Sequence, residues 1–200
     1  MRTGKRELQR RIAYDAARIL TELRSDNIAY ACQKAGAKYG ITKRQQLPTR
    51  EEVENALREQ QRLLRGEGQA NTLQALRKSA LSAMLALEGF QPKLVGAVFD
   101  GTADSNSTVK LHLYADTPEE LLFTLSDLHI PWQEKQHQMQ FSDGSRELIP
   151  CFLFSADGVG FELSVLPAHN PHNHPLDPLD SQPIQGATIK QLQLLIESPD

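Results

Sequence analysis

Cysteine, aromatic residues and long apolar segments are all scarce in this 200-residue sequence. The two cysteines, Cys32 and Cys151, show no paired spacing and are expected to be reduced thiols in a cytoplasmic protein. No run approaches the roughly 18 apolar residues of a membrane-spanning helix, so no membrane partner is expected. The N-terminus is basic but contains Glu7 and Asp15 and no continuous apolar core, which argues against a secretory signal and leaves an organelle presequence open.

A signature of serine hydrolases is missing as well. No nucleophile elbow accompanies the histidines and aspartates, so Ser-His-Asp catalysis is not expected. What the sequence does have is the composition of a globular protein, with 40% hydrophobic residues and a mean hydropathy of −0.45. Its length suffices for one domain of ordinary size or for two small domains that share an interface.

Charge is distributed unevenly along the chain. Residues 1–88 contain 17 Lys and Arg against 10 Asp and Glu, a balance of +7, whereas residues 89–200 contain 5 against 15, a balance of −10. Two interpretations are open: the basic half binds a polyanion such as RNA, or the two halves attract each other across their interface. Aromatic residues do not alternate with the basic ones, as they do where single-stranded RNA stacks on a protein.

The first half is expected to be helical. Apolar or small residues recur at helical spacing over residues 6–24, 27–39, 49–65 and 73–85. Thr49 and Glu52 form a capping box at the start of the third helix. Gly66-Glu67-Gly68 predicts a short flexible break, and Gly89 is expected to end the fourth helix.

The second half is expected to mix strands and helices. Strand patterns cover residues 94–96, 108–114, 133–141, 148–154 and 159–166, and helical patterns cover 117–128 and 187–197. Thr117 and Glu120 form a second capping box, while Asp143-Gly144 and Asp157-Gly158 are hairpin signals. The expected fold class is α+β, with an N-terminal helical region followed by a mixed sheet of four or five strands and flanking helices.

Residues 94–116 are the most suggestive of a binding site, because they predict a strand, a glycine-containing turn and a second strand. Gly96 would let a bound group approach the backbone, and the turn up to Gly101 would supply N–H groups for a phosphate. In the second strand Thr108 and Lys110 alternate with apolar neighbours, so one face of that strand is polar. A ligand-free β-turn-β unit is the alternative interpretation.

The order of residues in this stretch resembles the signature of the polymerase-β-like nucleotidyltransferase superfamily. That signature is a hydrophobic residue, Gly, then Gly or Ser, a short turn that ends in Gly, and Ser-Asp-hydrophobic-Asp-Leu on the next strand. The corresponding residues here are Val95-Gly96-Ala97, Gly101 and Ser107-Thr108-Val109-Lys110-Leu111. A third family carboxylate lies on a later strand, where Glu162 fits. The first half also looks like the helical leader of uncharacterised proteobacterial nucleotidyltransferase-like proteins, so the likeness covers most of the chain.

The metal-binding positions of the family are changed in this sequence. The resemblance implies divalent metals on two aspartates, but Thr108 and Lys110 stand there, and Ala97 replaces the serine that touches phosphate. Mg²⁺ needs oxygen ligands, and an ammonium group repels a cation by roughly 4 kcal/mol per unit charge at close range. Two-metal catalysis is therefore not expected. Nucleotide or phosphate binding is what the resemblance implies for Gly96, Ala97, Gly101, Ser107 and Lys110.

Lys110 and Glu162 would face the same cleft if the resemblance holds. We expect them to form an ion pair where the metal cluster would lie, or alternatively Lys110 to act as a fixed cation for the phosphates of a nucleotide. The expected organisation is a basic helical region at 1–68, a nucleotidyltransferase-like core at 69–166 that includes its preceding helix, and a Pro- and His-rich loop with a C-terminal helix at 167–200. That helix is expected to pack on the core.

The Pro-rich segment contains three histidines, His169, His172 and His174. Histidines at such spacing can bind zinc, but no cysteine or helix fixes their geometry, so no metal site is expected.

Three functions stay open. The leading hypothesis is a catalytically degenerate nucleotidyltransferase-fold protein that binds a nucleotide, RNA or a protein. The second is an active nucleotidyltransferase that uses Mg²⁺ on displaced carboxylates, for which the candidates are Asp100, Asp104, Asp116 and Glu162. The third is a purely structural interaction protein whose basic N-terminal helices dock a protein partner.

Overall fold

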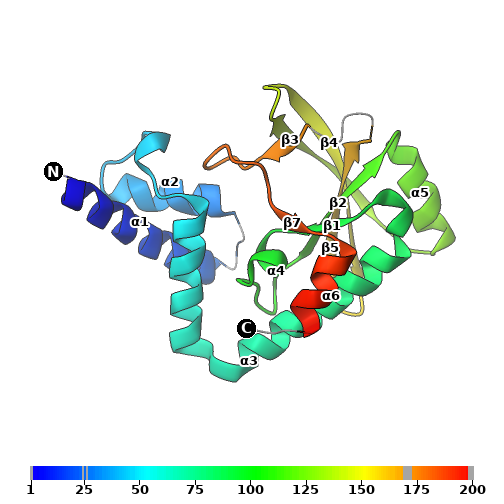
Figure 1. Ribbon diagram of the computed structural model, residues 1–200, viewed down its shortest axis with the longest axis horizontal. Coiled ribbons are helices and arrows are strands. Elements are labelled where there is room, and N and C mark those ends of the chain that lie inside the picture. The colour runs from blue at the N-terminus through cyan, green and yellow to red at the C-terminus, as the bar shows by residue number, and fades with distance from the viewer. Residues whose placement is uncertain (1, 24, 26, 169–172, 198–200) are drawn as a thin grey trace.

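The computed structural model describes residues 2–23, 25, 27–168 and 173–197, with side chains throughout except at 2–4 and 62–69. A helical part and a sheet part are connected by one long helix (Figure 1). The elements in chain order are α1 (Arg2–Leu23), α2 (Ile28–Lys38), η1 (Arg44–Gln46), α3 (Arg50–Ala86), η2 (Glu88–Phe90), β1 (Lys93–Val95), α4 (Ala97–Asp100), β2 (Val109–Ala115), α5 (Pro118–Asp127), β3 (Gln133–Phe141), β4 (Arg146–Ala156), β5 (Val159–Pro167), β6 (Pro175–Leu176), β7 (Gly186–Ala187) and α6 (Ile189–Glu197).

The helical part consists of α1, α2 and the first half of α3, as the sequence predicts. Its core contains small residues at the contacts, together with Ile12, Leu20, Val53 and Leu57. The side chain of Asn27 accepts a hydrogen bond from the Tyr30 amide and caps α2. A Cβ on Gly36 would lie 2.9 Å from the backbone carbonyl oxygen of Ile41, so this close approach of α2 to the following loop requires glycine.

Helix α3 differs from the sequence prediction in its length. Thr49 and Glu52 form the predicted capping box at its start, but the helix then continues through Gly66-Glu67-Gly68, where a flexible break was expected. Glycine costs about 1 kcal/mol relative to alanine within a helix, and neighbouring residues of high helix propensity can outweigh that cost. Figure 1 shows that α3 bends between its two halves, so one helix serves both parts of the molecule.

The sheet part is the predicted mixture of strands and helices. Its sheet has the order β6-β3-β4-β5-β2-β1-β7, in which β2 and β5 are parallel and the other neighbours are antiparallel. Asp143-Gly144 and Asp157-Gly158 connect antiparallel strands, which confirms both hairpins. Four or five strands were expected. The additional ones, β6 and β7, are two residues long each: β6 comes from the segment predicted to be a loop, and β7 includes Ala187, where the C-terminal helix was expected to begin but α6 begins at Ile189.

The two faces of the sheet have different surroundings. Alternate residues of β2 and β5 face a core that also contains residues of α5, α6 and the second half of α3; its fully buried members include Leu111, Leu121, Phe152, Leu163 and Leu192. The intervening residues, such as Lys110 and Glu162, face the other side and line a cleft toward the helical part. In the described part of the chain no helix is long and apolar enough to cross a membrane.

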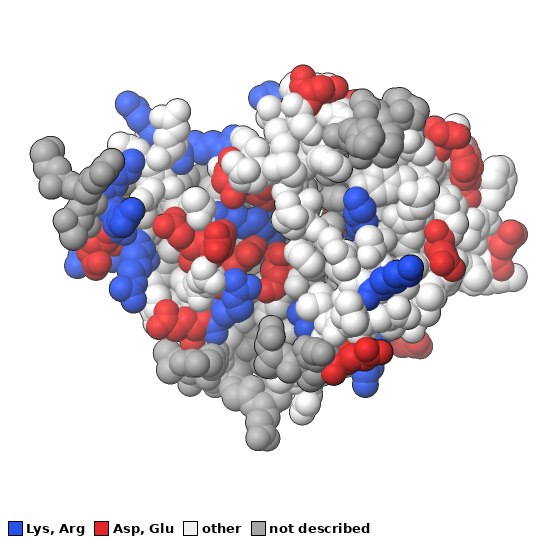
Figure 2. Space-filling model, viewed as in Figure 1, with Lys and Arg blue, Asp and Glu red and all other residues white. Residues whose placement is uncertain are grey.

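Arginine side chains of the helical part join it to the rest of the chain. Arg50 lies 2.9 Å from Asp100 Oδ2 and 2.7 Å from Asp177 Oδ2, and Arg44 donates to the carbonyl oxygen of Leu179 at 2.6 Å. Leu179 also packs in the core of the helical part. These contacts support the interpretation that the two halves attract each other. Figure 2 shows basic and acidic side chains intermixed over the helical part, whereas acidic ones predominate at the right-hand margin.

Candidate functional site: a polar cleft between helices and sheet

A cleft of about 930 Å³ lies between the helical part and the open face of the sheet. Its wall includes four of the five residues predicted to bind a nucleotide or phosphate, namely Gly96, Ala97, Ser107 and Lys110. Glu162 lies on the same wall. Thr108, one of the two changed metal positions, also lines it. The sequence-based prediction therefore names residues that the fold brings to one cavity.

The segment between β1 and β2 is more ordered than the expected turn. It contains the single-turn helix α4, which begins after Gly96 at φ 72° and ends at Gly101 at φ 78°. Both glycines have left-handed backbone conformations that side chains disfavour. Gly96 lines the cleft, and a Cβ there would lie 3.6 Å from Lys110 Cδ. A Cβ on Gly101 would instead face Arg77 and Leu73, so Gly101 shapes the turn and is not among the residues that line the cleft.

Ser107 is held at the end of this segment by Asp104. The Asp104 amide donates to Ser107 Oγ at 2.9 Å, and Ser107 Oγ donates to Asp104 Oδ1 at 3.3 Å. The Asn106 amide donates to the same carboxylate oxygen at 2.9 Å. Short polar side chains satisfy the backbone of a turn in this way. The loop therefore reaches the cleft in a defined conformation, with Asp104 as part of its wall.

Lys110 and Glu162 lie directly opposite each other on the parallel strands β2 and β5. Both line the cleft, and the Glu162 side chain is only 15% exposed. A third residue joins them from β3, since His137 Nδ1 lies 3.7 Å from Glu162 Oε1. The register confirms that Lys110 and Glu162 are neighbours on one face, and the ion pair between them stays a prediction.

Sequence analysis did not single out the residues at the floor of the cleft. His112 and Ser164 pair across β2 and β5, and both side chains are buried. Burial, together with the charges of Lys93 and Lys110, lowers the pKa of His112 to about 4, so the imidazole is neutral at physiological pH. Ser164 Oγ lies 3.3 Å from the thiol sulfur of Cys151, whose pKa is raised by burial. The floor thus offers neutral hydrogen-bonding groups beside a cation.

Residues of β3 and several arginines were also missed. Gln136, Gln138 and Gln140 line the cleft together with His137. The unusual glutamine content of this strand was visible in the sequence, but nothing in it showed that the strand borders the cleft. Three arginines also line the cleft, each from a different element: Arg44 from η1, Arg50 from α3 and Arg146 from β4. They come from distant parts of the chain, and no local pattern brings them together.

The displaced carboxylates do not converge on one point. Asp104 and Glu162 line the cleft, Asp100 is bound to Arg50 at 2.9 Å, and Asp116 is exposed just beyond the end of β2. Among the described residues, no three His, Cys, Asp or Glu side chains are grouped so that they could hold a metal ion. His169 and His172 lie outside the described residues, and the amide of His174 donates to Ser142 Oγ.

The sequence matches no protein-family model, and no curated protein is significantly similar to it. The chemistry of the cleft therefore follows from its own residues. Lys110 and the exposed Arg146 supply cationic donors for an anion, whereas Arg44 and Arg50 are engaged at the junction with the helical part. The glutamines supply amide donors and acceptors, and His137 lies against the carboxylate of Glu162 on one wall. Such a set can bind a polar, negatively charged ligand that also carries neutral hydrogen-bonding groups.

Proposed function

We propose that the cleft binds a nucleotide, with Lys110 as the cation for its phosphates, and that the chain does not transfer nucleotidyl groups. The observation that carries this proposal is the register of β2 and β5, which sets Lys110 beside Glu162 on the wall of the cleft. In the family that the sequence resembles, the metals are held at the corresponding place. A fixed ammonium group supplies positive charge there without a metal.

The size and polarity of the cleft support the same proposal. Ligand pockets typically have volumes of about 300–1,000 Å³, and the volume of about 930 Å³ leaves room for a triphosphate, a ribose and a base. Gly96 keeps the wall beside Lys110 free of a side chain. Neutral His112 and Ser164, with the glutamines of β3, supply hydrogen bonds for the uncharged parts of a nucleotide.

A binding experiment with a matched pair of variants tests the role of Lys110. We expect ATP, GTP, CTP or UTP to bind in the presence of EDTA, and Lys110→Ala to weaken that binding at least about tenfold, equivalent to 1.4 kcal/mol. The control is Lys190→Ala, which removes an exposed lysine of α6 that does not line the cleft. Isothermal titration calorimetry measures both. Equal losses in the two variants, or none in Lys110→Ala, would contradict the proposed role.

An active transferase is the second candidate, because Asp104 and Glu162 line the same cleft. Incubation with each labelled nucleoside triphosphate plus Mg²⁺ or Mn²⁺ tests it. Product formation that is lost in Glu162→Gln would establish the enzyme and overturn the proposal of a binder.

RNA binding and a purely structural role are separated by a salt titration. Phosphate contacts weaken steeply with salt, so RNA bound by the basic helices would dissociate between about 50 and 200 mM NaCl, independently of Lys110. An absence of nucleotide and RNA binding under all of these conditions would contradict the proposal and favour the purely structural interaction protein.

A further inference from the structure

A second, apolar groove of about 320 Å³ lies on the helix-covered side of the sheet. It is bounded by the C-terminal end of α3, the end of α5 and the hairpin between β4 and β5. Its floor is formed by the buried side chains of Leu87, Leu125 and Phe161. Phe154 stacks on Phe161 with ring centroids 5.0 Å apart and continues the apolar surface to the rim.

The wall of the groove on α3 consists of small residues, which leave space above the floor. Ser79, Ser82, Ala83 and Ala86 line it at intervals of three or four residues, which places them along one face of the helix. Leu128, at the opposite wall, is 46% exposed. A row of small residues facing large apolar ones is the form of a groove into which another helix places its anchors.

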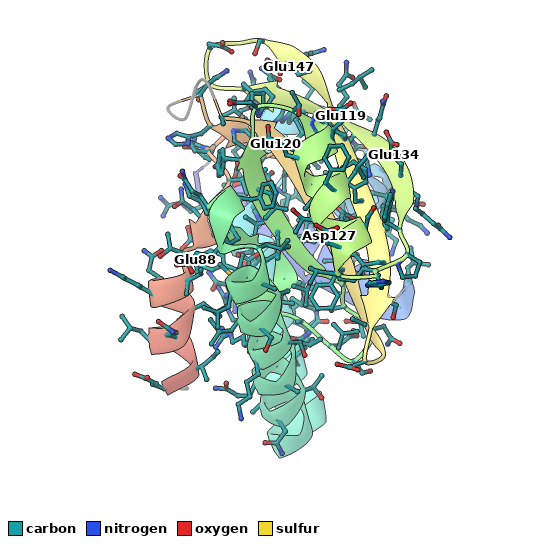
Figure 3. All side chains as sticks on the ribbon, turned by 90° about the vertical axis from the view of Figure 1, so that its right-hand side faces the viewer. Glu88, Glu119, Glu120, Asp127, Glu134 and Glu147 are labelled. Carbon is teal, nitrogen blue, oxygen red and sulfur yellow. The ribbon has the colours of Figure 1, made fainter. Side chains whose placement is uncertain are left out.

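Carboxylates lie beside this groove and elsewhere on the same side of the molecule. Glu88 and Asp127 are next in sequence to the lining residues Leu87 and Leu128, whereas Glu119 and Glu120 lie in the first turn of α5 and Glu147 lies at the opposite end of β4 from the β4–β5 hairpin. Figure 3 shows Glu88 at the end of α3, Glu119, Glu120 and Asp127 on α5, and Glu134 and Glu147 on the hairpin β3–β4, all on the side that faces the viewer. All six are exposed, and a seventh carboxylate, Asp157, lines the groove itself. Lys78 is the basic residue among the lining side chains. The rim therefore favours a partner of positive charge.

We propose that this groove docks a basic amphipathic helix from a partner protein. The apolar side of that helix occupies the floor over Leu87 and Phe161, and its Lys and Arg residues lie against Glu88, Asp127 and Asp157. The groove supplies affinity through burial of apolar area, and the rim supplies orientation and a fast association rate.

A second copy of this chain fits the groove less well for two reasons. Two grooves facing each other would bring their acidic rims together, and like charges repel. The basic helix α1 cannot supply the anchors either, because its apolar residues Ile12, Leu20 and their neighbours are buried in the helical core. The occupant is therefore a different chain with an exposed apolar stripe and basic flanks.

The test uses a synthetic helix as the probe. It is a fluorescein-labelled peptide of about 14 residues, built from Leu and Lys so that the leucines form one helical face. A permuted peptide of the same composition without that face, and a Leu/Glu peptide of the same pattern, are its controls. Fluorescence anisotropy gives the affinities, and backbone amide shifts locate the bound peptide on the full-length protein.

We expect the amphipathic Leu/Lys peptide to bind at least tenfold more tightly than either control and to shift the amides near Leu87, Leu128 and Asp157. Ala86→Arg, at an exposed position of the groove wall, should weaken binding at least tenfold. The matched charge variants are Glu88→Lys, which should weaken it, and Glu59→Lys on the helical part, which should not.

Three outcomes would overturn the proposal. These are an absence of binding, equal binding of the permuted peptide, and amide shifts outside the groove. If sedimentation equilibrium shows a dimer that Ala86→Arg dissociates, the groove is occupied by a second copy and the proposed partner is wrong.

Discussion

At the residue scale, two buried titratable side chains respond to pH in opposite directions. His112, at the floor of the cleft, has a pKa lowered to about 4 by burial and by Lys93 and Lys110. Glu54, beside Arg50, has a pKa raised to about 7, first by burial and then by the neighbouring Asp100. Their effects on folding stability overlap at mildly acidic pH and partly cancel there.

Replacing His112 should change how the protein responds to acid. In the unfolded chain the imidazole takes up a proton below about pH 6.5, whereas in the folded chain it does so only near pH 4. His112 therefore makes the free energy of unfolding fall as the pH decreases from 6.5 to 4, by up to about 3 kcal/mol. We expect His112→Gln to lose less stability between about pH 7 and 5 than the wild type, as measured by urea unfolding. An unchanged slope would show that folding does not lower the pKa of His112.

Replacing Glu54 should act in the opposite sense. Its pKa is higher in the folded chain, so the folded state holds more protons between pH 4.5 and 7 and loses stability as the pH rises through that window. Glu54→Gln keeps the shape and supplies a permanent amide donor toward Asp100. We expect this variant to be more stable than the wild type near pH 8, by up to about 3 kcal/mol, and similar to it near pH 5. Lower stability at pH 8 would mean that the charge of Glu54 is needed by Arg50.

In the sheet part, local signals in the sequence predicted which face of a strand a residue occupies, but they did not predict which residues of other strands it contacts. Period-two alternation set Lys110 and Glu162 on polar strand faces before the register was known. His137, which reaches Glu162 from β3, depends on a pairing between distant strands that alternation does not reveal. The same limit applies to Arg50, whose partner Asp177 follows it by 127 residues.

At the element scale, α3 connects the two parts of the molecule. Its first half packs with α1 and α2, and its second half packs under the sheet. Glycines at 66 and 68 suggested a break because glycine weakens a helix locally. Here the low helix propensity of glycine was outweighed, because the helical segments before and after these glycines are each anchored in a core. Capping boxes at Thr49 and Thr117 were predicted correctly because each depends on residues only three positions apart.

A glycine replacement distinguishes the continuous helix from the break. We expect Gly68→Ala to raise the free energy of unfolding by up to about 1 kcal/mol, because alanine loses less conformational entropy in a helix. Gly101→Ala is the matched control: its φ of 78° is strained for alanine, so the same change should be destabilising. Both are measured by thermal unfolding. A destabilised Gly68→Ala variant would show that the backbone there is not helical.

The Arg50 cluster operates between elements as well. Arg50 Nε lies 2.6 Å from Glu54 Oε1, in an ion pair without the alignment of a hydrogen bond, and its two terminal nitrogens contact Asp100 and Asp177. One guanidinium therefore connects α3, the end of α4 and the segment after β6. Although burial lowers it, the pKa of Arg50 is raised overall by Asp100, Glu54 and Asp177, so its charge is permanent.

At the scale of the whole molecule, the opposite charges of the two halves meet at this junction. The polar cleft lies beside it, and the acidic, apolar groove lies on the far side of the sheet. The two proposed ligands, a nucleotide and a basic helix, would therefore not compete for the same surface. The charge imbalance was visible in the sequence, but only the fold shows that part of it is used within the chain.

The measurement that tests the central claim most directly is the affinity for ATP in EDTA and in Mg²⁺, determined on the same wild-type protein. The proposal that Lys110 takes the place of a metal predicts that ATP binds in EDTA and that Mg²⁺ strengthens this binding by no more than about threefold, or 0.7 kcal/mol. Binding that is detected only when Mg²⁺ or Mn²⁺ is present would contradict the account, because it would show that the cleft depends on a metal.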